Sequence, residues 1–387
     1  MKKILLGALG AALMLGAAGA AQTKLPSRDH FLFWTPAEQA LGYKNIEKIF
    51  PTRTVKRGGP VAVLPHAGGA FDVSYKFGGA TVDTAGFMKN TNASGLIVIQ
   101  HGKILLERYG LGRTEHDRWT SFSVAKSVTS TLIGAAIKDG HIKSLQSPVT
   151  DYLPDLKGTA YDGVTVADLI TMRSGVKWNE DYTDPKSDVN QFGQQPKRAD
   201  GKDPIEAYMA KLPRANKPGT VFHYDTGETD LAGILVAQAT KMHLADYLSQ
   251  KIWTKIGPEQ DAIWIVDKGG EEMGGCCLSM TLRDYARFGL FFLHDGVVNG
   301  EHILPDGWVK AASSVQAENH EGGYGYFWWI HPGHGYAAEG IFGQAIAIDP
   351  KTDSVIVINS AWPVADADKY WATLTAYTDA VQDKLAK

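Results

Sequence analysis

The chain has little cysteine, little excess charge and only one long uncharged apolar run. Its 387 residues include two cysteines, Cys276 and Cys277, and the formal net charge is −3. Two adjacent cysteines cannot staple distant parts of a chain, which excludes a disulfide-rich scaffold. A mildly acidic chain also lacks the excess of basic residues that binds nucleic acid. We therefore expect no nucleic-acid partner.

The two neighbouring cysteines leave two interpretations open. They stand in the glycine-rich stretch of residues 274–278. A disulfide is permitted in an oxidising compartment, although a bond between neighbours closes a strained ring; two small buried thiols fit the sequence equally well. Two cysteines without nearby paired histidines make a poor metal site. We expect no metal and no cofactor.

The uncharged apolar run lies at the N-terminus. Lys2 and Lys3 precede it, and it extends over residues 4–21 and ends in small residues. This order is typical of a secretory signal peptide, and the run is short and rich in glycine and alanine for a membrane span. We expect residues 1–21 to be a signal peptide, the mature protein to be secreted or periplasmic, and no stable membrane insertion after cleavage.

The remaining chain is long enough for two lobes, because chains beyond ~250–300 residues usually divide their core. Strand signals gather towards both ends of the chain and helical signals gather in the middle. We predict an α/β lobe formed by residues 22–122 and 265–387, with a mainly helical lobe formed by residues 123–264. The two lobes would make one catalytic unit.

Alternating and periodic apolar residues predict the individual elements. A hairpin is expected over residues 95–109, with its turn at His101-Gly102, where a glycine permits a tight reversal. Further strands are expected at 324–330, 343–349 and 354–359, and helices at 165–170, 229–240, 244–256 and 369–385. A long loop is expected at about 177–203, and loops of that length are usually functional or disordered.

The most informative local pattern is a serine and a lysine at the start of an apolar helix. Ser123 opens a run whose only charged residue before Lys138 is Lys126. Residues three apart share a helix face, so the Lys126 amine can lie beside the Ser123 hydroxyl. Burial would push the pKa of this lysine down towards the neutral amine that a general base needs. The pair predicts nucleophilic attack on a carbonyl carbon.

The same spacing occurs a second time and has a simpler explanation in both places. A serine can merely cap a helix and a lysine can extend its amine to water. Ser174 and Lys177 repeat the spacing, but Gly175 lies between them and no apolar helix follows. The surrounding sequence therefore favours Ser123 as the nucleophile.

Several ordered motifs together resemble the serine beta-lactamase and penicillin-binding protein superfamily. The likeness is to its class C-like branch, which contains esterases, D-amino-acid amidases and nylon-oligomer (aminohexanoate dimer) hydrolases. The motifs that carry it are Ser123-Val-Ala-Lys126-Ser127 and the stretches at 147–156, 164–175, 222–227, 278–289 and 340–344. The resemblance implies an α/β (α+β) fold, in which helices flank an antiparallel sheet beside a mainly helical lobe.

The resemblance also implies roles for residues outside the nucleophile helix. Tyr224, followed by Asp225-Thr226, matches the family tyrosine that relays a proton to the leaving group. Gly343 and Gln344 match the strand beside the site, where a backbone N–H would join that of Ser123 in an oxyanion hole. This strand has no lysine or histidine to hold a beta-lactam carboxylate, so efficient beta-lactamase activity is not expected.

The long loop looks closest to the nylon-oligomer hydrolase branch. Its acidic residues Glu180, Asp181 and Asp184 could attract an amine on a substrate, although acidic loop residues are more often simply solvated. We count Tyr182 and Asp184 as candidate substrate-binding residues, together with Gly343 and Gln344.

The sequence thus predicts an exported serine hydrolase that acts on a small-molecule ester or amide. Ser123 would carry the acyl group, Lys126 would act as the general base, and Tyr224 would relay the proton. Two alternatives remain open: beta-lactamase or D-alanyl peptidase activity, and a non-catalytic binding protein on the same scaffold.

Overall fold

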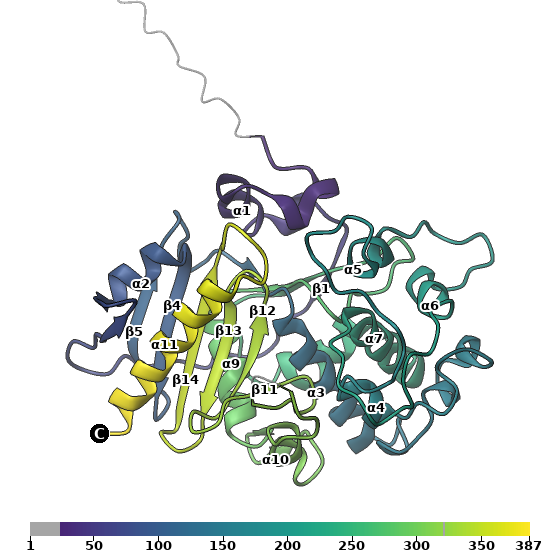
Figure 1. Cartoon of the computed structure of the whole chain (residues 1–387). Coiled ribbons are helices and arrows are strands. Elements are labelled where there is room, and N and C mark those ends of the chain that lie inside the picture. Colours follow the sequence, from purple (N-terminus) through teal and green to yellow (C-terminus); the bar gives the residue numbers. More distant parts are fainter. Residues whose placement is uncertain (1–23, 320–321) are drawn as a thin grey trace, which may run out of the picture.

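The computed structural model describes residues 24–319 and 322–387 (Figure 1). The predicted signal peptide, residues 1–21, lies outside the described residues. Across the two described ranges, no helix combines the length and the apolar character that a membrane span requires.

A six-stranded antiparallel sheet forms the centre of the fold (Figure 1). Successive side chains of a strand point to opposite faces, and both faces of this sheet are covered. In the interior strand β4 (Ala93–Gln100), Ile97 and Ile99 enter one core cluster, whereas Leu96 and Val98 enter the other. The strands, in spatial order, are β11 (Trp329–Ile330), β12 (Tyr336–Gly340), β13 (Gln344–Asp349), β14 (Ser354–Ser360), β4 (Ala93–Gln100) and β5 (Lys103–Tyr109).

A smaller antiparallel sheet brings distant parts of the chain together. Its strand β6 (Trp119–Thr120) ends just before Ser123 and pairs with β8 (Leu278–Met280). This pairing sets the residues that precede Ser123 beside the residues that precede β8. The other two strands are β7 (Ala262–Ile265) and β1 (Thr52–Val55), and two separate hairpins are formed by β2 (Ser74–Phe77) with β3 (Ala80–Asp83) and β9 (Val297–Val298) with β10 (Glu301–His302).

Helices cover both faces of the large sheet and gather on one side of it (Figure 1). The helix α3 (Val124–Lys138) is buried from Val124 to Ala136, because it contacts α7 on one side and β12 and β13 on the other. The remaining helices are α1 (Pro36–Gly42), α2 (Thr84–Asn90), α4 (Val166–Ile170), α5 (Asp188–Gln191), α6 (Pro204–Met209), α7 (Thr226–Thr240), α8 (Leu244–Leu248), α9 (Leu282–Leu293), α10 (Trp308–Ala312) and α11 (Asp368–Leu385).

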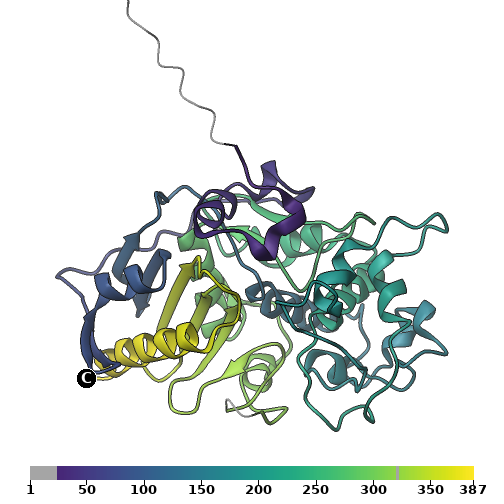
Figure 2. The same cartoon turned by 45° about the horizontal axis from the view of Figure 1, so that its top comes forward.

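The segment before β1 lies over the region where the sheet meets the helices (Figure 2). It contains a 3₁₀ segment, Arg28–Phe33, from which Phe31 and Leu32 pack against the core. Phe31 stacks on Phe122, the residue before Ser123, with ring centroids 5.1 Å apart. The N-terminal part of the described chain is therefore packed against the start of α3.

Most of the predicted elements are confirmed. The hairpin of β4 and β5 turns at His101-Gly102, and β13, β14 and α11 follow their predicted positions within a few residues. The antiparallel sheet flanked by helices is the predicted fold class. The division into two lobes stays a prediction, and one hydrophobic cluster runs through both of its parts.

The predicted strand at 324–330 is wrong over most of its length, since only β11 is a strand there. Phe327 adopts a positive φ of 59°, which breaks an extended strand. Tertiary contacts hold it: its N–H donates to the Ile170 carbonyl at 3.1 Å, and its carbonyl accepts from the Ser127 hydroxyl at 2.6 Å. The predicted helix at 244–256 is shorter than expected, because α8 ends at Leu248 and a π-helical turn, Ser249–Trp253, follows it.

Candidate active site

Ser123 stands at the entrance of α3 with its hydroxyl free of a capping role. It is the N-cap residue, but its side chain accepts no hydrogen bond from the first helical turn. The preceding residue, Phe122, has a φ of 42°, which is rare for a residue with a Cβ and is found where a site constrains the backbone. The capping explanation of Ser123 therefore fails, and its hydroxyl is available for chemistry.

Lys126 is buried next to this hydroxyl, so it does not extend its amine to water. Its side chain is 1% exposed, and its Nζ lies 3.3 Å from Ser123 Oγ. The amine also donates to Thr226 Oγ1 at 3.0 Å and to the Gly275 carbonyl at 2.9 Å. Elements far apart in the sequence thus hold the Lys126 amine beside the Ser123 hydroxyl.

Burial lowers the pKa of Lys126 to about 8, against the opposing attraction of three carboxylates, Glu180, Asp230 and Asp225. Burial also raises the pKa values of Asp225 and Asp230, which favours their neutral forms. A neutral acid holds a neighbouring ammonium less strongly than a carboxylate does. With a pKa of about 8, Lys126 is uncharged in a fraction of molecules at neutral pH and mainly uncharged above pH 8.

Tyr224 completes the group around Ser123. Its ring centroid lies 5.3 Å from Lys126 Nζ, and its phenol interacts with the Ser123 side chain. The ring is stacked on Trp329 with centroids 5.6 Å apart. Burial raises the pKa of Tyr224 well above its usual value of 10, so the phenol keeps its proton. The three residues predicted to do the chemistry are thus brought together.

The second Ser-x-x-Lys sequence does not form such a pair. The Lys177 side chain is exposed, whereas the Ser174 hydroxyl is buried and accepts a hydrogen bond from the Val176 N–H at 3.0 Å. The structure therefore agrees with the preference for Ser123 that its apolar context indicated.

Glu180 connects the long loop to the start of α7. Its carboxylate accepts from the Tyr182 hydroxyl at 2.5 Å, from the Thr226 N–H at 3.0 Å, and from the Thr226 hydroxyl and the Trp178 indole. Because the hydroxyl proton of Thr226 points to Glu180, its oxygen is left to accept from Lys126. The sequence analysis considered Glu180 for amine recognition but favoured simple solvation, and it did not predict this link to Thr226, which the folded loop creates.

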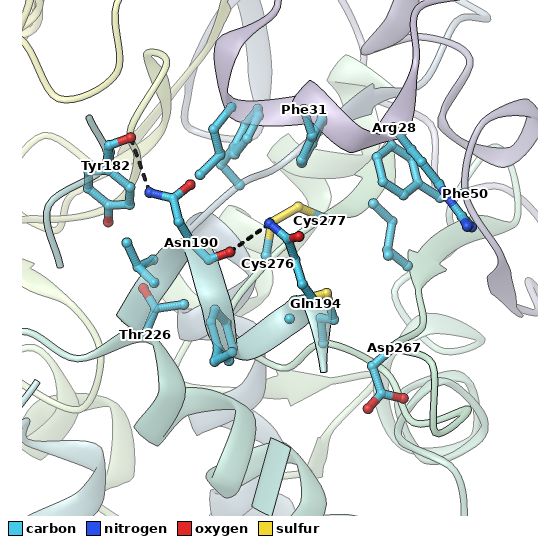
Figure 3. A pocket seen from close by; sticks show the side chains of 18 of the residues that line it. Arg28, Phe31, Phe50, Tyr182, Asn190, Gln194, Thr226, Asp267, Cys276 and Cys277 are labelled. Carbon is cyan, nitrogen blue, oxygen red and sulfur yellow. Dashed lines mark hydrogen bonds between the residues drawn. A yellow bond between two sulfur atoms is a disulfide. The ribbon is translucent and has the colours of Figure 1, made fainter. Parts of the chain in front are cut away.

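A cavity of about 260 Å³ is lined in part by Ser123. Figure 3 shows other side chains that line it. Tyr182 and Thr226 lie on one side of the view, and Arg28, Phe50 and Asp267 lie towards the other. Charged side chains at Arg28, Asp29, Asp267 and Lys268 line part of the cavity. About half of the lining residues are apolar, and these are Phe31, Leu32, Phe33, Phe50, Pro51, Phe122, Val189, Phe192, Ile265, Val266, Met273 and Ile341. The wall from Arg28 to Phe33 was not predicted, because residues 22–93 show no periodicity that would place them at a site.

A family model matches most of the chain. The family model described as Beta-lactamase matches residues 82–379. The chain belongs to the beta-lactamase family. This confirms the predicted superfamily and identifies a hydrolase of the beta-lactamase-like kind.

Individual members of the family agree with this assignment. A 6-aminohexanoate-dimer hydrolase from Paenarthrobacter ureafaciens is 34% identical over 301 residues, which cover 73% of this chain and 76% of the relative. A structure assigned as a 6-aminohexanoate-dimer hydrolase from Bacillus anthracis has a TM-score of 0.80 at 25% identity and covers 94% of this chain and 98% of that one. The octameric penicillin-binding protein homologue from Pyrococcus abyssi shares the fold. Its TM-score is 0.61 at 18% identity, and the match covers 78% of this chain and 76% of that one.

Gly343 and Gln344, at the start of β13, were expected to border the substrate, and the structure places them differently. Gln344 is fully buried, and its side-chain amide accepts from the Phe342 N–H at 3.3 Å and donates to the Ser360 carbonyl at 2.9 Å. Gly343 donates its N–H to the Gly340 carbonyl at 2.9 Å. Neither residue lines the cavity, whereas Ile341 does. Within the described ranges, the N–H groups of Ser123 and Ile341 donate to no acceptor, so both remain available to an oxyanion.

Of the two loop candidates, only Tyr182 lines the cavity. The Asp184 carboxylate accepts from the Lys186 N–H at 2.8 Å and does not border the cavity. Asn190 organises this loop, because its side-chain amide donates to the Tyr182 carbonyl at 3.3 Å (Figure 3) and to the Asp184 carbonyl at 3.0 Å. The loop thus presents Tyr182 to the site and turns Asp184 away from it.

Gly343 should be indispensable for the local fold. Its φ is 84°, and a Cβ there would lie 2.3 Å from the ring of the buried Trp362. We expect Gly343→Ala to lower the free energy of unfolding by about 3 kcal/mol, the sum of a left-handed backbone and steric overlap. Urea unfolding followed by circular dichroism measures it.

Gly140→Ala is the matched control for this prediction. Its φ is also positive, at 79°, but a Cβ there would meet nothing within 4 Å. This variant should lose only about 1 kcal/mol, the backbone part of the effect. Equal losses in the two variants would contradict the steric argument.

The structure joins the two cysteines in a disulfide, which is one of the two interpretations left open by the sequence. Both line the cavity, where their sulfur atoms are seen among the other lining side chains (Figure 3). Cys277 is 1% exposed and has a φ of 74°. The sequence indicated neither this position at the cavity nor the conformation.

One group of side chains in the described part of the chain has the spacing of a metal site: His243, Glu271 and Glu272. The Glu272 carboxylate is already paired with Arg53 at 2.9 Å and accepts from the Ala245 N–H at 3.0 Å. The Glu272 carboxylate therefore accepts from backbone N–H groups at the N-terminus of α8, where a negative charge is favourable. The group is therefore accounted for without a metal ion.

Proposed function

We propose that this beta-lactamase-family hydrolase cleaves a linear aliphatic amide or ester through an acyl-enzyme on Ser123. The observation that carries the proposal is the arrangement around the Lys126 amine. A neutral amine has two N–H groups and one lone pair. In the charged form Lys126 Nζ donates to Thr226, to the Gly275 carbonyl and to Ser123 Oγ. When the amine loses a proton and keeps its N–H groups on Thr226 and Gly275, its lone pair faces Ser123 Oγ and can take the hydroxyl proton.

The steps follow from these positions. Lys126 takes the hydroxyl proton as Ser123 Oγ attacks the carbonyl carbon, and the N–H groups of Ser123 and Ile341 stabilise the oxyanion. Tyr224, which keeps its proton, donates it to the leaving amine or alcohol and regains one through Lys126. Water then hydrolyses the acyl-enzyme by the same acid–base route in reverse and frees Ser123.

The substrate class rests on the cavity and on the relatives. The apolar part of the cavity beside the nucleophile suits an unbranched aliphatic chain. The relative from Paenarthrobacter ureafaciens is named for a dimer of 6-aminohexanoate, which is a linear aliphatic amide. No lysine or histidine stands at residues 341–343 to pair with a beta-lactam carboxylate. We therefore favour linear substrates over beta-lactams.

The proposal includes export, for which residues 1–21 carry the signal-peptide pattern. A disulfide between Cys276 and Cys277 is consistent with an oxidising compartment. Expression of the full chain in a Gram-negative host followed by fractionation tests it. The proposal expects a periplasmic product that begins near residue 21, whereas an uncleaved cytoplasmic product would contradict it.

A substrate panel tests the proposed reaction. It contains p-nitrophenyl acetate and butyrate, the linear dimer of 6-aminohexanoate, a D-alanyl amide and nitrocefin. We expect turnover of the linear esters and the linear amide, with nitrocefin and the D-alanyl amide slower. Preferred turnover of nitrocefin would favour beta-lactamase activity, and binding without turnover of any compound would favour a binding protein.

The pH dependence of the reaction should report Lys126. Because the base must be unprotonated and its pKa is about 8, kcat/KM for p-nitrophenyl butyrate should rise about tenfold per pH unit below pH 8 and level off above it. The measurement is a pH series corrected for the spontaneous hydrolysis of the ester. A rate that is flat between pH 6 and 8 would show that another group acts as the base.

A further inference from the structure

The Cys276–Cys277 disulfide lies where the cavity wall meets the catalytic lysine. Both cysteines line the same cavity as Ser123 (Figure 3). The residue immediately before them, Gly275, provides the carbonyl that accepts from Lys126 Nζ at 2.9 Å. The disulfide is therefore one residue away from an atom that holds the proposed base.

The segment around the disulfide, residues 274–278, is bound to the start of α3 at several points. The Gly274 carbonyl accepts from the Thr129 hydroxyl at 2.7 Å, and the Leu278 N–H donates to Ser121 Oγ at 3.0 Å. The Cys277 N–H donates to the Phe122 carbonyl at 3.4 Å. The segment thus contacts residues on both sides of Ser123.

On its other side the segment packs against α7 without spare room. A Cβ on Gly274 would lie 2.6 Å from the Thr229 carbonyl oxygen, and a Cβ on Gly275 would lie 2.9 Å from Asp230 Oδ2. Glycine is required at both positions because the backbone itself fills the space between α3 and α7. A small movement of this backbone would therefore move the Gly275 carbonyl relative to Lys126.

The conformation at Cys277 needs support. Its φ of 74° lies in the left-handed region that residues with a Cβ rarely adopt, and Phe122, to which it donates, has a φ of 42°. A covalent ring through both side chains restricts the backbone of both cysteines. When the ring opens, Cys277 is free to return to an ordinary negative φ.

We propose that the Cys276–Cys277 disulfide is a positioning element of the active site, which fixes the Gly275 carbonyl on the Lys126 amine. This inference rests on the proposed function of Lys126 as the base. Its reduction loosens the segment 274–278, misplaces the amine and slows acylation of Ser123. The effect is reversible, because reoxidation closes the same ring.

The reduction is a two-electron exchange with a dithiol such as dithiothreitol. The S–S bond breaks, each sulfur gains one electron and one proton to become a thiol, and the reductant closes into its own cyclic disulfide. The reductant therefore supplies all the electrons and protons that the step requires.

Reduction should also change the pKa of Lys126, and the groups around the amine set the direction of that change. Glu180 faces the amine from the long loop, Asp225 and Asp230 face it from α7, and the neutral phenol of Tyr224 lies beside it. Burial is the largest cause of the low pKa of Lys126, and the carboxylates oppose it. Because an opened segment admits water, the pKa should rise from about 8 towards its usual value near 10.5.

The test compares oxidised, reduced and reoxidised enzyme. Thiol titration of the denatured protein without reductant should find no free thiol in the native enzyme. Reduction should lower kcat/KM for p-nitrophenyl butyrate about tenfold and move the midpoint of its pH profile upward, and reoxidation should restore both. Two free thiols in native enzyme, or an unchanged rate and midpoint after reduction, would overturn the inference.

The double variant Cys276→Ser/Cys277→Ser is the matched control. It should have the low activity and the raised midpoint of the reduced enzyme, and it should not respond to dithiothreitol. Circular dichroism of each form shows whether it is folded. If the folded variant has the wild-type rate and midpoint, the disulfide has no positioning role.

A second readout separates this inference from the proposed function. A fluorophosphonate probe reacts with an activated serine whatever the natural substrate is, and its rate of attachment to Ser123 measures the activation directly. Slower attachment after reduction supports the inference even if every ester and amide in the panel is a poor substrate. If the probe labels Ser123 equally fast in both forms, the inference fails while the proposed function stands.

Discussion

Replacing Ser123 with alanine is expected to lower kcat for p-nitrophenyl butyrate by about 10⁴-fold or more, because the variant has no atom that can carry the acyl group. Folding should not change, since the Ser123 side chain makes no capping bond to α3. The measurement is steady-state kinetics of wild type and variant, with circular dichroism to compare their folds.

Ser174→Ala is the matched control for the nucleophile. Ser174 has the same spacing to a lysine, Lys177, and its hydroxyl is also buried, but it does not line the cavity. This variant should keep kcat near the wild-type value in its folded state. A Ser123→Ala enzyme that keeps more than a tenth of the wild-type kcat would contradict the mechanism.

Replacing Lys126 with methionine should have the next largest effect, a loss of about 10³-fold in kcat. Methionine has a similar length and no charge, so it fills the buried space but cannot take the Ser123 proton. It also leaves Thr226 and the Gly275 carbonyl without the amine that they now accept from. The remaining activity should no longer show a midpoint near pH 8 in its pH profile.

Lys177→Met controls for the removal of a lysine charge. Lys177 is exposed, so its loss should leave both kcat and the pH profile as they are in the wild type. If Lys126→Met retains activity within tenfold and keeps the pH midpoint, another residue acts as the base and the role of Lys126 is wrong.

The parts of the site that could be predicted from the sequence are those set by local spacing. Ser123 and Lys126 lie three residues apart on one helix, so their distance follows from helical geometry. Tyr224 came from a motif that the family resemblance supplied, not from spacing. The hairpin of β4 and β5 was predictable because a glycine turn separates two apolar strands.

The rest depends on contacts between distant segments. The Gly275 carbonyl reaches Lys126 only because β6 pairs with β8 and the segment before β8 fits between α3 and α7. Glu180 links to Thr226 across a fold of the long loop. Hydrogen bonds to Ser127 and Ile170 hold Phe327 in a conformation that a strand does not allow. None of these partners is near in sequence, so periodicity and propensity contain no signal for them.

The cavity wall shows the same limit. Residues Arg28–Phe33 line the cavity through Phe31 and its neighbours, although they lie almost a hundred residues before Ser123. Gly343 and Gln344 were predicted to border the substrate. Instead, Gly343 packs against the Trp362 ring and the Gln344 side chain donates to the Ser360 carbonyl. Ile341 borders the cavity in their place. A motif locates a segment of the chain, while packing decides which of its atoms reach the site.

The most direct test of the central claim is to trap the acyl-enzyme. Wild-type enzyme and Ser123→Ala are mixed with p-nitrophenyl butyrate, quenched in acid within milliseconds to seconds, and digested for peptide mass spectrometry. The account predicts one butyryl group per wild-type chain, attached to the peptide that contains Ser123, and none on the variant. Butyryl groups on another residue, or turnover by the variant at the wild-type rate, would contradict it.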